Sequence, residues 1–368
     1  MFLIKSEAYA ANDAELARVE GMSVPPNTEV VLASTPGVRR LLNSPEVCGN
    51  EFQSKLSESL QSTLRQLVAA SDLSRLSHEM DSAPIDVIYI LRGGLNFDLH
   101  YCLSMLTARD CEVSFVSSQR TTDDYGTGFK ITEDGYRKWN LHDNGIIFIG
   151  DIVATGTTVA RVLNEIGNIY EGQGKGPNWL VIVTIGTMQC LEVLSDALNR
   201  LSRRLKFKGA TIIFLEQMFN LYDGKMPLLS NTHLPMTDFF RNFFPRAVAF
   251  ERESLKNPIC LVERCAIYDG GSRSFEPRTY LNNLELYWTR LREFSHESLM
   301  ELLALKSDLF DCRLSFEAWM TKRQWWSKED DLARLRELYD LGAAALSFFE
   351  NASVSEICER RLEEIRGH

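Results

Sequence analysis

The stretch from Gly145 to Leu163 decides the fold, and it reads Gly-Ile-Ile-Phe-Ile-Gly-Asp-Ile-Val-Ala-Thr-Gly-Thr-Thr-Val-Ala-Arg-Val-Leu. The apolar run from Ile146 to Ile149 is short and rich in β-branched residues, which is typical of a buried strand. The small polar run Thr155–Thr158 follows. Apolar residues then recur at helical spacing, at Val159, Val162, Leu163 and Ile166. The pattern predicts a strand, a tight polar loop and the first turn of a helix.

This loop has the chemistry of a phosphate-binding site. The first turn of a helix has backbone N–H groups without partners inside the helix, and the helix dipole places positive charge there. Small residues let the backbone close around a phosphate, and threonine hydroxyls add hydrogen-bond donors. Asp151 lies at the carboxyl end of the strand, where ligands bind in open α/β sheets.

Two common nucleotide-binding motifs do not fit this stretch. It is not a Walker loop, because five residues separate Gly150 from Gly156 and no lysine precedes Thr157. The dinucleotide fingerprint G-x-G-x-x-G is also absent. An ordinary strand–helix turn of an α/β protein is the alternative interpretation.

The stretch resembles the phosphoribosyl-diphosphate (PRPP) loop of type I phosphoribosyltransferases. That loop consists of a hydrophobic strand, two acids, a short spacer and Thr-Gly-x-Thr. A second stretch fits the same family: the apolar run Asp86–Leu91 ends in Arg92-Gly93-Gly94-Leu95, where the family has its diphosphate loop. Glycines there permit unusual backbone geometry, and the arginine supplies a fixed cation.

A third stretch lies between these two in the chain. Val113–Ser117 has the pattern of a strand, and Ser117-Ser118-Gln119-Arg120 opens a polar stretch with Tyr125, Gly126 and Gly128. Members of the resembled family carry a flap there that closes over the reacting centre. The three signals come in the family's order, each after a strand, and the resemblance covers residues 85–220.

Strands alternate with amphipathic helices along this region, which predicts an α/β fold with a doubly wound parallel sheet. We expect five strands, as in the phosphoribosyltransferase-like fold, with the two ligand loops at one edge. The expected strands are Asp86–Leu91, Val113–Ser117, Ile146–Gly150, Trp179–Ile185 and Thr211–Leu215.

The two ends of the chain lie outside the resemblance. We interpret residues 1–50 as irregular, because Pro25, Pro26 and Pro36 punctuate them. Residues 217–280 hold several aromatic residues, and the resemblance implies that the family's variable hood over the acceptor lies here; a hydrophobic core is the alternative role for these side chains. From residue 282 onward the pattern is helical, and Ser353 with Glu356 predicts a capping box. We therefore predict a phosphoribosyltransferase-like domain over residues 1–281 and an appended helical domain over residues 282–368.

The composition of the chain argues against several classes of function. The formal net charge of −10 argues against a broad nucleic-acid surface. The aromatic and basic residues Trp319, Lys322, Arg323, Trp325 and Trp326 could bind nucleic acid, but helix packing with snorkelling cations is the favoured interpretation. No apolar run approaches membrane-spanning length, and Lys5 and Glu7 interrupt the apolar start of the chain, so we expect neither a membrane segment nor a secretory signal. The scattered cysteines favour a reduced, cytoplasmic protein.

The resemblance implies a chemistry. PRPP binds with Mg²⁺, and its diphosphate leaves C1 of the ribose as an acceptor attacks through an oxocarbenium-like transition state. It implies catalytic roles for Asp151, Arg92 and Arg120, and a metal contact at Asp151. The residues it assigns to PRPP are Arg92, Gly93, Gly94, Ser118, Asp151, Ala154, Thr155, Gly156, Thr157 and Thr158.

The sequence departs from the family at two positions. Gly150 stands where the family usually has an acid beside the one matching Asp151, so half of the ribose-hydroxyl clamp is missing. Ala154 stands where purine-salvage members have an aspartate that exchanges a proton with the base. Those members also carry a lysine after the fourth strand, where this chain has Ile185-Gly186-Thr187-Met188. Purine salvage is therefore poorly supported.

Two functional hypotheses remain open. The first is a transferase with an unusual acceptor; helical additions of this kind also resemble phosphoribosyltransferase-like effectors of bacterial, retron-type antiviral defence cassettes. The second is a PRPP- or nucleotide-binding sensor that has lost turnover. The expected partners are PRPP or a nucleotide, a regulatory protein or ribonucleoprotein, and further copies of the chain.

Overall fold

A computed structural model of the protein describes residues 3–5, 14–70, 75–91, 93–117, 119–122, 129–133, 136–221, 239–263, 270–323 and 332–367. Within these residues, no helix is both long and apolar enough to cross a membrane.

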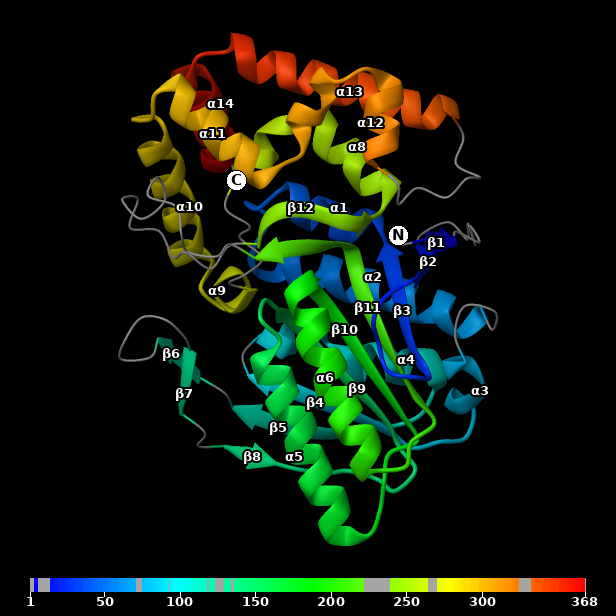
Figure 1. The fold of residues 1–368 in the computed structure, drawn as a ribbon. Coiled ribbons are helices and arrows are strands. Elements are labelled where there is room, and N and C mark those ends of the chain that lie inside the picture. The colour runs from blue at the N-terminus through cyan, green and yellow to red at the C-terminus, as the bar shows by residue number, and fades with distance from the viewer. Residues whose placement is uncertain are drawn as a thin grey trace.

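Ten of the described strands form one sheet, and two form a separate antiparallel ribbon (Figure 1). The strands of the large sheet are β1 (Leu3–Lys5), β2 (Glu15–Glu20), β3 (Thr28–Ser34), β4 (Ile85–Leu91), β5 (Glu112–Ser117), β8 (Arg137–Lys138), β9 (Ile146–Val153), β10 (Trp179–Thr187), β11 (Gly209–Leu221) and β12 (Phe239–Arg246). The ribbon pairs β6 (Gln119–Thr122) with β7 (Phe129–Glu133).

The sheet has a parallel centre and a reversal in its winding. Six adjacent strands run parallel in the order β3-β11-β10-β9-β4-β5. The chain passes from β4 outward to β5, then returns to the other side of β4 and continues outward through β9, β10 and β11. The winding therefore reverses between β4 and β9, and such a switch point is where open α/β sheets bind ligands.

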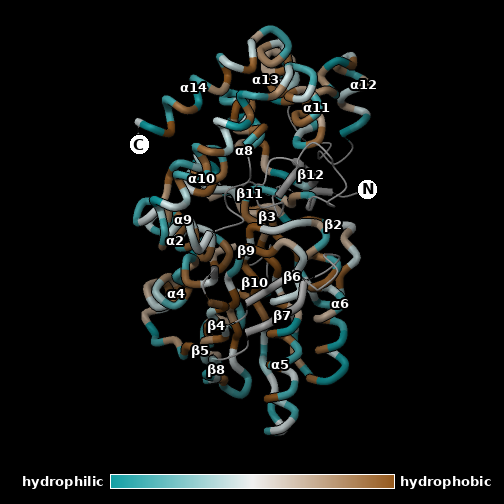
Figure 2. Tube along the Cα trace, turned by 90° about the vertical axis from the view of Figure 1, so that its left-hand side faces the viewer, coloured by the Kyte–Doolittle hydropathy of each residue, from teal (hydrophilic) through white to brown (hydrophobic). Residues whose placement is uncertain are grey.

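Helices cover both faces of this sheet, as a doubly wound fold requires. The helices on one face are α1 (Pro36–Asn43), α2 (Gly49–Ala69) and α4 (Leu99–Thr107), with α3 (Leu76–Met80) and the short 3₁₀ helix η1 (Gly93–Phe97) beside them. The other face is covered by α5 (Thr157–Gln173) and α6 (Met188–Arg204), which lie in front of the sheet in Figure 1. Strands β9 and β10 between the two layers are strongly hydrophobic (Figure 2).

The predicted strands are all present, but the prediction of five strands is wrong in number. Strand β3 pairs in parallel with β11 and lies within the first fifty residues, so the prediction that these residues are irregular is wrong. The prolines there border elements and do not interrupt them: Pro36 occupies the first turn of α1, and the Thr35 hydroxyl caps that helix by accepting from the N–H of Val38 at 3.2 Å.

The C-terminal part is helical, as predicted. Its elements are α8 (Val248–Lys256), η2 (Pro258–Val262), α9 (Gly270–Phe275), α10 (Pro277–Leu291), α11 (His296–Lys306), η4 (Leu309–Arg313), α12 (Phe316–Lys322), α13 (Leu332–Asn351) and α14 (Val354–Arg366). The predicted capping box of Ser353 with Glu356 is confirmed at the start of α14. The boundary between residues 281 and 282 stays a prediction; apolar packing runs across it, because Ile259 and Val262 share a cluster with Trp288.

Packing also decides the interpretation of the aromatic and basic residues in this part. Trp319 is fully buried, and the guanidinium of Arg323 lies over its ring at 4.2 Å. Packing is therefore confirmed for Trp319, whereas the prediction of a snorkelling cation is wrong for Arg323, which is 3% exposed and pairs with Glu251 and Asp308. Trp325 and Trp326 lie outside the described residues. Phe219 of the aromatic hood region is buried in the sheet's apolar cluster, whereas Tyr222 lies outside the described residues.

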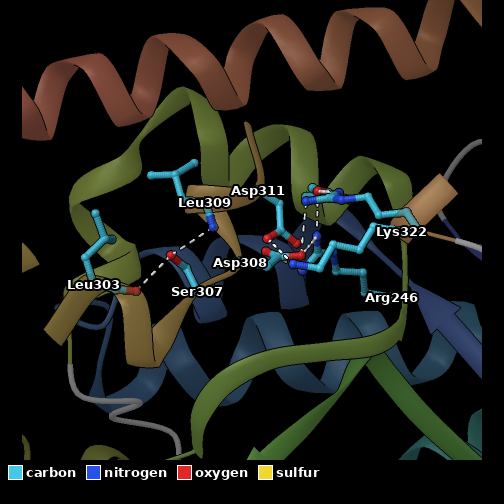
Figure 3. Close-up of polar contacts among 9 residues, drawn as sticks. Arg246, Leu303, Ser307, Asp308, Leu309, Asp311 and Lys322 are labelled. Atoms are coloured by element: carbon cyan, nitrogen blue, oxygen red, sulfur yellow. Dashed lines mark hydrogen bonds and ion pairs between the residues drawn. The ribbon is translucent and has the colours of Figure 1, made fainter. Parts of the chain in front are cut away.

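Two buried ionic clusters join the helical part to the rest of the molecule. In the first, Arg246 at the end of β12 meets Asp308 and Glu251, and Figure 3 shows Arg246 directed toward Asp308. In the second, Arg361 of α14 pairs with Glu46, which lies between α1 and α2, and with Glu263. Charges this deeply buried need such partners, so these clusters fix where the helices dock.

A buried carboxyl, Glu216, lies where β3, α1, β11 and α8 meet. Its oxygens accept hydrogen bonds from the Ser34 hydroxyl and the Thr35 N–H, both at 2.6 Å. Burial raises the pKa of Glu216 from its ordinary 4.5 to about 8, although these hydrogen bonds and the charge of Arg39 act in the opposite direction. Arg39 itself pairs with Glu253 of α8 at 2.7 Å.

We expect this carboxyl to make stability depend on pH. Because the folded pKa is raised, the contribution of Glu216 is fully present below pH 4.5 and is lost as pH rises through about 8. The free energy of unfolding, measured by denaturant titration at several pH values, should fall less steeply in Glu216→Gln than in the wild type. Glu301→Gln, at an exposed position of α11, is the matched control and should keep the wild-type slope. Equal slopes for Glu216→Gln and the wild type would contradict this assignment.

Candidate functional site

Asp151 lies at the carboxyl end of β9, beside the switch point. It is 9% exposed, and its Oδ1 accepts a hydrogen bond from the N–H of Ile152 at 2.9 Å. Residues alternate sides along a strand, and Ile149 and Val153 pack in the apolar cluster under α5 and α6. Asp151 therefore projects from the side of β9 that carries α5.

The loop after β9 has the geometry that the sequence predicts. Gly156 adopts a left-handed φ of 79°, and a Cβ atom at this position would lie 3.2 Å from the carbonyl oxygen of Cys190, so only glycine suits the turn. It directly precedes α5, whose start has no side-chain cap. The hydroxyls of Thr155 and Thr157 lie 3.0 Å apart, and Thr157 is exposed. An uncapped helix start with nearby hydroxyls is suited to a phosphate.

Thr187 holds this loop in place from the neighbouring helix. Its buried hydroxyl donates to the carbonyl oxygen of Ala154 and accepts from the N–H of Cys190 at 3.0 Å, capping α6. The N-cap of α6 is thus a threonine whose hydroxyl caps the helix, whereas the N-cap of α5 is Gly156, which has no side chain. The Thr155 hydroxyl lies 3.5 Å from the N–H of Thr157, and the two helix starts lie at the same edge of the sheet.

The loop after β4 closes against β9 from the other side of the switch point. Tyr89 and Gly150 are register partners, and a Cβ atom on Gly94 would lie 2.9 Å from the carbonyl oxygen of Gly150. A side chain at position 94 would push the two loops apart. The predicted meeting of the loops at one edge is therefore confirmed for Gly94 and the β9 strand.

The packing around Gly150 gives a physical reason for the absence of an acid at this position. A Cβ atom there would lie 2.7 Å from Cβ and Cγ of Phe97 and 2.9 Å from Cδ1 of Leu99, and both side chains are fully buried. Ala154 also belongs to this apolar cluster. Both departures from the family pattern thus face the apolar layer under α2 and α4, where an unpaired carboxylate would be costly.

A third element, α9, borders the site from the helical part of the chain. A Cβ atom on Gly270 would lie 2.6 Å from Cδ1 of Ile152, the residue after Asp151. The Gly270 carbonyl oxygen accepts from Nδ2 of Asn96 in η1 at 2.7 Å. Further along α9, the buried Arg273 donates to the carbonyl oxygen of Val47 at 2.6 Å, and its guanidinium lies over the ring of Phe52 in α2 at 4.7 Å, which fixes α9 against α2.

The structure therefore brings together a large part of the predicted site, namely Gly93, Gly94, Asp151, Ala154, Thr155, Gly156, Thr157 and Thr158. Thr158 is buried in the first turn of α5. Arg92, Ser118 and the side chain of Arg120 lie outside the described residues, so their predicted roles stay predictions.

Asp151 supplies the carboxylate that could bind a metal ion at this site. Within the described part of the chain, no group of three or more His, Cys, Asp or Glu side chains is arranged to hold a metal ion. Mg²⁺ is often bound by one or two carboxylates together with substrate phosphates. A single aspartate beside a phosphate loop fits that mode, in which the ligand itself supplies the remaining oxygens.

Sequence reasoning missed two residues of this site. Thr187 directly precedes an amphipathic helix, which is the position of a helix cap, and this signal could have identified it. Asn96 follows the diphosphate-type loop, and nothing in the local pattern indicates that its partner is Gly270.

Comparisons with known proteins give partial similarities. No known family model matches the sequence, and no curated protein matches it. A hypoxanthine-guanine phosphoribosyltransferase from Bacillus anthracis is 18% identical over 42% of this chain and 80% of its own, with a TM-score of 0.26. A purine phosphoribosyltransferase from Pyrococcus horikoshii is 13% identical over 45% and 90%, with a TM-score of 0.25. A hypothetical protein from Neisseria gonorrhoeae with bound ppGpp is 10% identical over 36% and 69%, with a TM-score of 0.24. Similarities this weak establish neither fold nor function, and the architecture of the chain is given by its own strand order and register.

Proposed function

We propose that this protein binds PRPP with Mg²⁺ at the β4–β9 switch point and transfers the phosphoribosyl group to an acceptor. The observation that carries the proposal is the uncapped start of α5, which lies next to Asp151 at the carboxyl edge. The loop Ala154–Thr158 would hold the 5′-phosphate, Gly93 and Gly94 would face the diphosphate, and Asp151 would contact the ribose hydroxyls.

The protein would accelerate the reaction mainly by positioning PRPP and the acceptor. When the acceptor attacks C1 and the C1–O bond to diphosphate breaks, the ribose gains positive charge and the leaving group takes the electron pair. Holding both anionic ends places the acceptor and C1 in line, and fixed donors stabilise the departing diphosphate. Bound Mg²⁺ would neutralise part of the diphosphate charge.

The alternative is a PRPP- or nucleotide-binding sensor without turnover. The packing of Phe97 against Gly150 favours it, because the site then has one carboxylate at a position where the resembled family usually has two. The two functions differ in one product. A transferase releases diphosphate in the presence of an acceptor, and a sensor releases none.

Replacing Asp151 tests the site directly. In Asp151→Asn the retained Oδ1 still accepts from Ile152, so the fold should persist while the charge is lost. We expect PRPP to bind at least about tenfold more weakly by calorimetry, and diphosphate release to disappear. Asp196→Asn, on the exposed side of α6, is the control and should behave as wild type. Unchanged affinity and turnover in Asp151→Asn would remove Asp151 from the site.

The biological setting is part of the same proposal. A cytoplasmic transferase of this kind, held inactive by a regulatory protein or ribonucleoprotein, would act as a toxic effector in antiviral defence. Growth arrest of bacteria on expression of the wild type, but not of Asp151→Asn, would support that role. These partners, the acceptor and self-association stay predictions.

A further inference from the structure

Asn96 presents an unusual polar atom at the edge of the candidate site. The residue is 1% exposed, and its Nδ2 donates a hydrogen bond to the carbonyl oxygen of Gly270. Its Oδ1 is buried and has no hydrogen-bond partner in the part of the chain that the structure describes. A buried acceptor without a donor is destabilising, so it calls for an explanation such as a bound ligand, water or ion.

The surroundings of Asn96 connect this atom to the ligand loops. Asn96 lies in η1 between Gly94, where an added Cβ atom would be 2.9 Å from the Gly150 carbonyl oxygen, and Phe97, which fills the space beside Gly150. Gly270, its hydrogen-bond partner, contacts Ile152, the neighbour of Asp151. The amide is therefore held between η1 and α9 beside the β4–β9 switch point.

We propose that Oδ1 of Asn96 accepts a hydrogen bond from a ribose hydroxyl of the ligand and so replaces the acceptor that position 150 cannot supply. This inference rests on the proposed function. An amide oxygen accepts from a hydroxyl as a carboxylate does, and it adds no negative charge beside the ligand's phosphates. Asp151 provides the other acceptor, and α9 fixes the orientation of the amide through Gly270.

The test compares sugar phosphates that differ by one hydroxyl. Calorimetry would measure ribose 5-phosphate, 2-deoxyribose 5-phosphate and 3-deoxyribose 5-phosphate against the wild type and three Asn96 variants. In the wild type, one deoxy analogue should bind about tenfold more weakly than ribose 5-phosphate, as expected for one lost hydrogen bond. Asn96→Leu and Asn96→Ala should lose this discrimination, because neither retains an acceptor.

Asn96→Asp separates ligand contact from a structural role. All three variants lose the donor to Gly270, but Asn96→Asp keeps an oxygen at the Oδ1 position. Its added charge should weaken every phosphate ligand to a similar extent and leave the ratio between hydroxyl and deoxy ligands unchanged. A purely structural role would affect all variants alike and would not alter that ratio.

Two outcomes would overturn the inference in different ways. If the wild type discriminates between the sugars and Asn96→Leu and Asn96→Ala discriminate equally well, Asn96 serves only to hold α9. If the wild type binds neither PRPP nor ribose 5-phosphate, the proposed function fails and the role of Asn96 fails with it. Melting curves of the variants identify any loss of affinity that is caused by unfolding.

Discussion

Gly150→Asp should unfold or strongly destabilise the protein and should not produce a faster enzyme. The new Cβ atom would lie 2.7 Å from Cβ and Cγ of Phe97. Overpacking of a dense core costs about 1–3 kcal/mol, and the buried, unpaired carboxylate adds to this, so we expect a total loss above about 3 kcal/mol. The acid that is usual in the resembled family therefore cannot be restored by this substitution alone.

Alanine variants separate the steric effect from the charge. Gly150→Ala adds only the Cβ atom and should lower the free energy of unfolding by about 1–3 kcal/mol in denaturant titrations. Gly172→Ala is the matched control, because nothing lies within 4 Å of a Cβ atom there. This helical position should gain about 0.5–1 kcal/mol from the alanine. A stable Gly150→Asp protein would show that η1 can move away from β9 and would reopen the two-carboxylate clamp.

Removing one charge from the buried cluster of Arg246, Glu251, Asp308 and Arg323 should lower the stability of the fold nearly as much as Gly150→Asp does. Glu251 is 4% exposed and pairs with both Arg246, at 2.6 Å, and Arg323. Burial alone would raise the pKa of Asp308, but the charges of Arg246 and Arg323 outweigh it and hold the pKa below its ordinary range. Two guanidiniums thus share two carboxylates, and Glu251→Gln would leave one positive charge in excess. We expect a loss of about 3–5 kcal/mol.

A double variant tests whether charge balance is the cause. Glu251→Gln with Arg323→Met removes one charge of each sign, so its loss in the free energy of unfolding should be clearly smaller than the sum of the two single losses. Glu350→Gln removes one partner of the exposed Arg313 pair and should cost less than about 1 kcal/mol. Additive losses in the double variant would mean that shape, and not charge, dominates this junction.

The local sequence predicted much of the fold. Apolar runs of strand length predicted β4, β5, β9, β10 and β11 because a buried strand needs a continuous apolar segment. Each strand is present, although β11 continues to Leu221, beyond the expected end at Leu215. The glycine and threonines after β9 predicted the turn into α5 because only glycine readily adopts its left-handed φ. The capping box at Ser353 could be predicted equally well from the sequence, because its two residues lie within one helical turn.

What the sequence determined by itself was therefore local: strand and helix periods, caps, and the order of three loops. Tertiary structure decided that β3 joins the sheet, that Phe97 fills the space beside Gly150, that Thr187 anchors the Ala154 carbonyl, and that Gly270 orients Asn96. Each of these contacts joins residues far apart in the chain. Periodicity and capping depend on neighbours within a turn or a strand, whereas close packing and the pairing of buried polar atoms depend on which distant segments share a space.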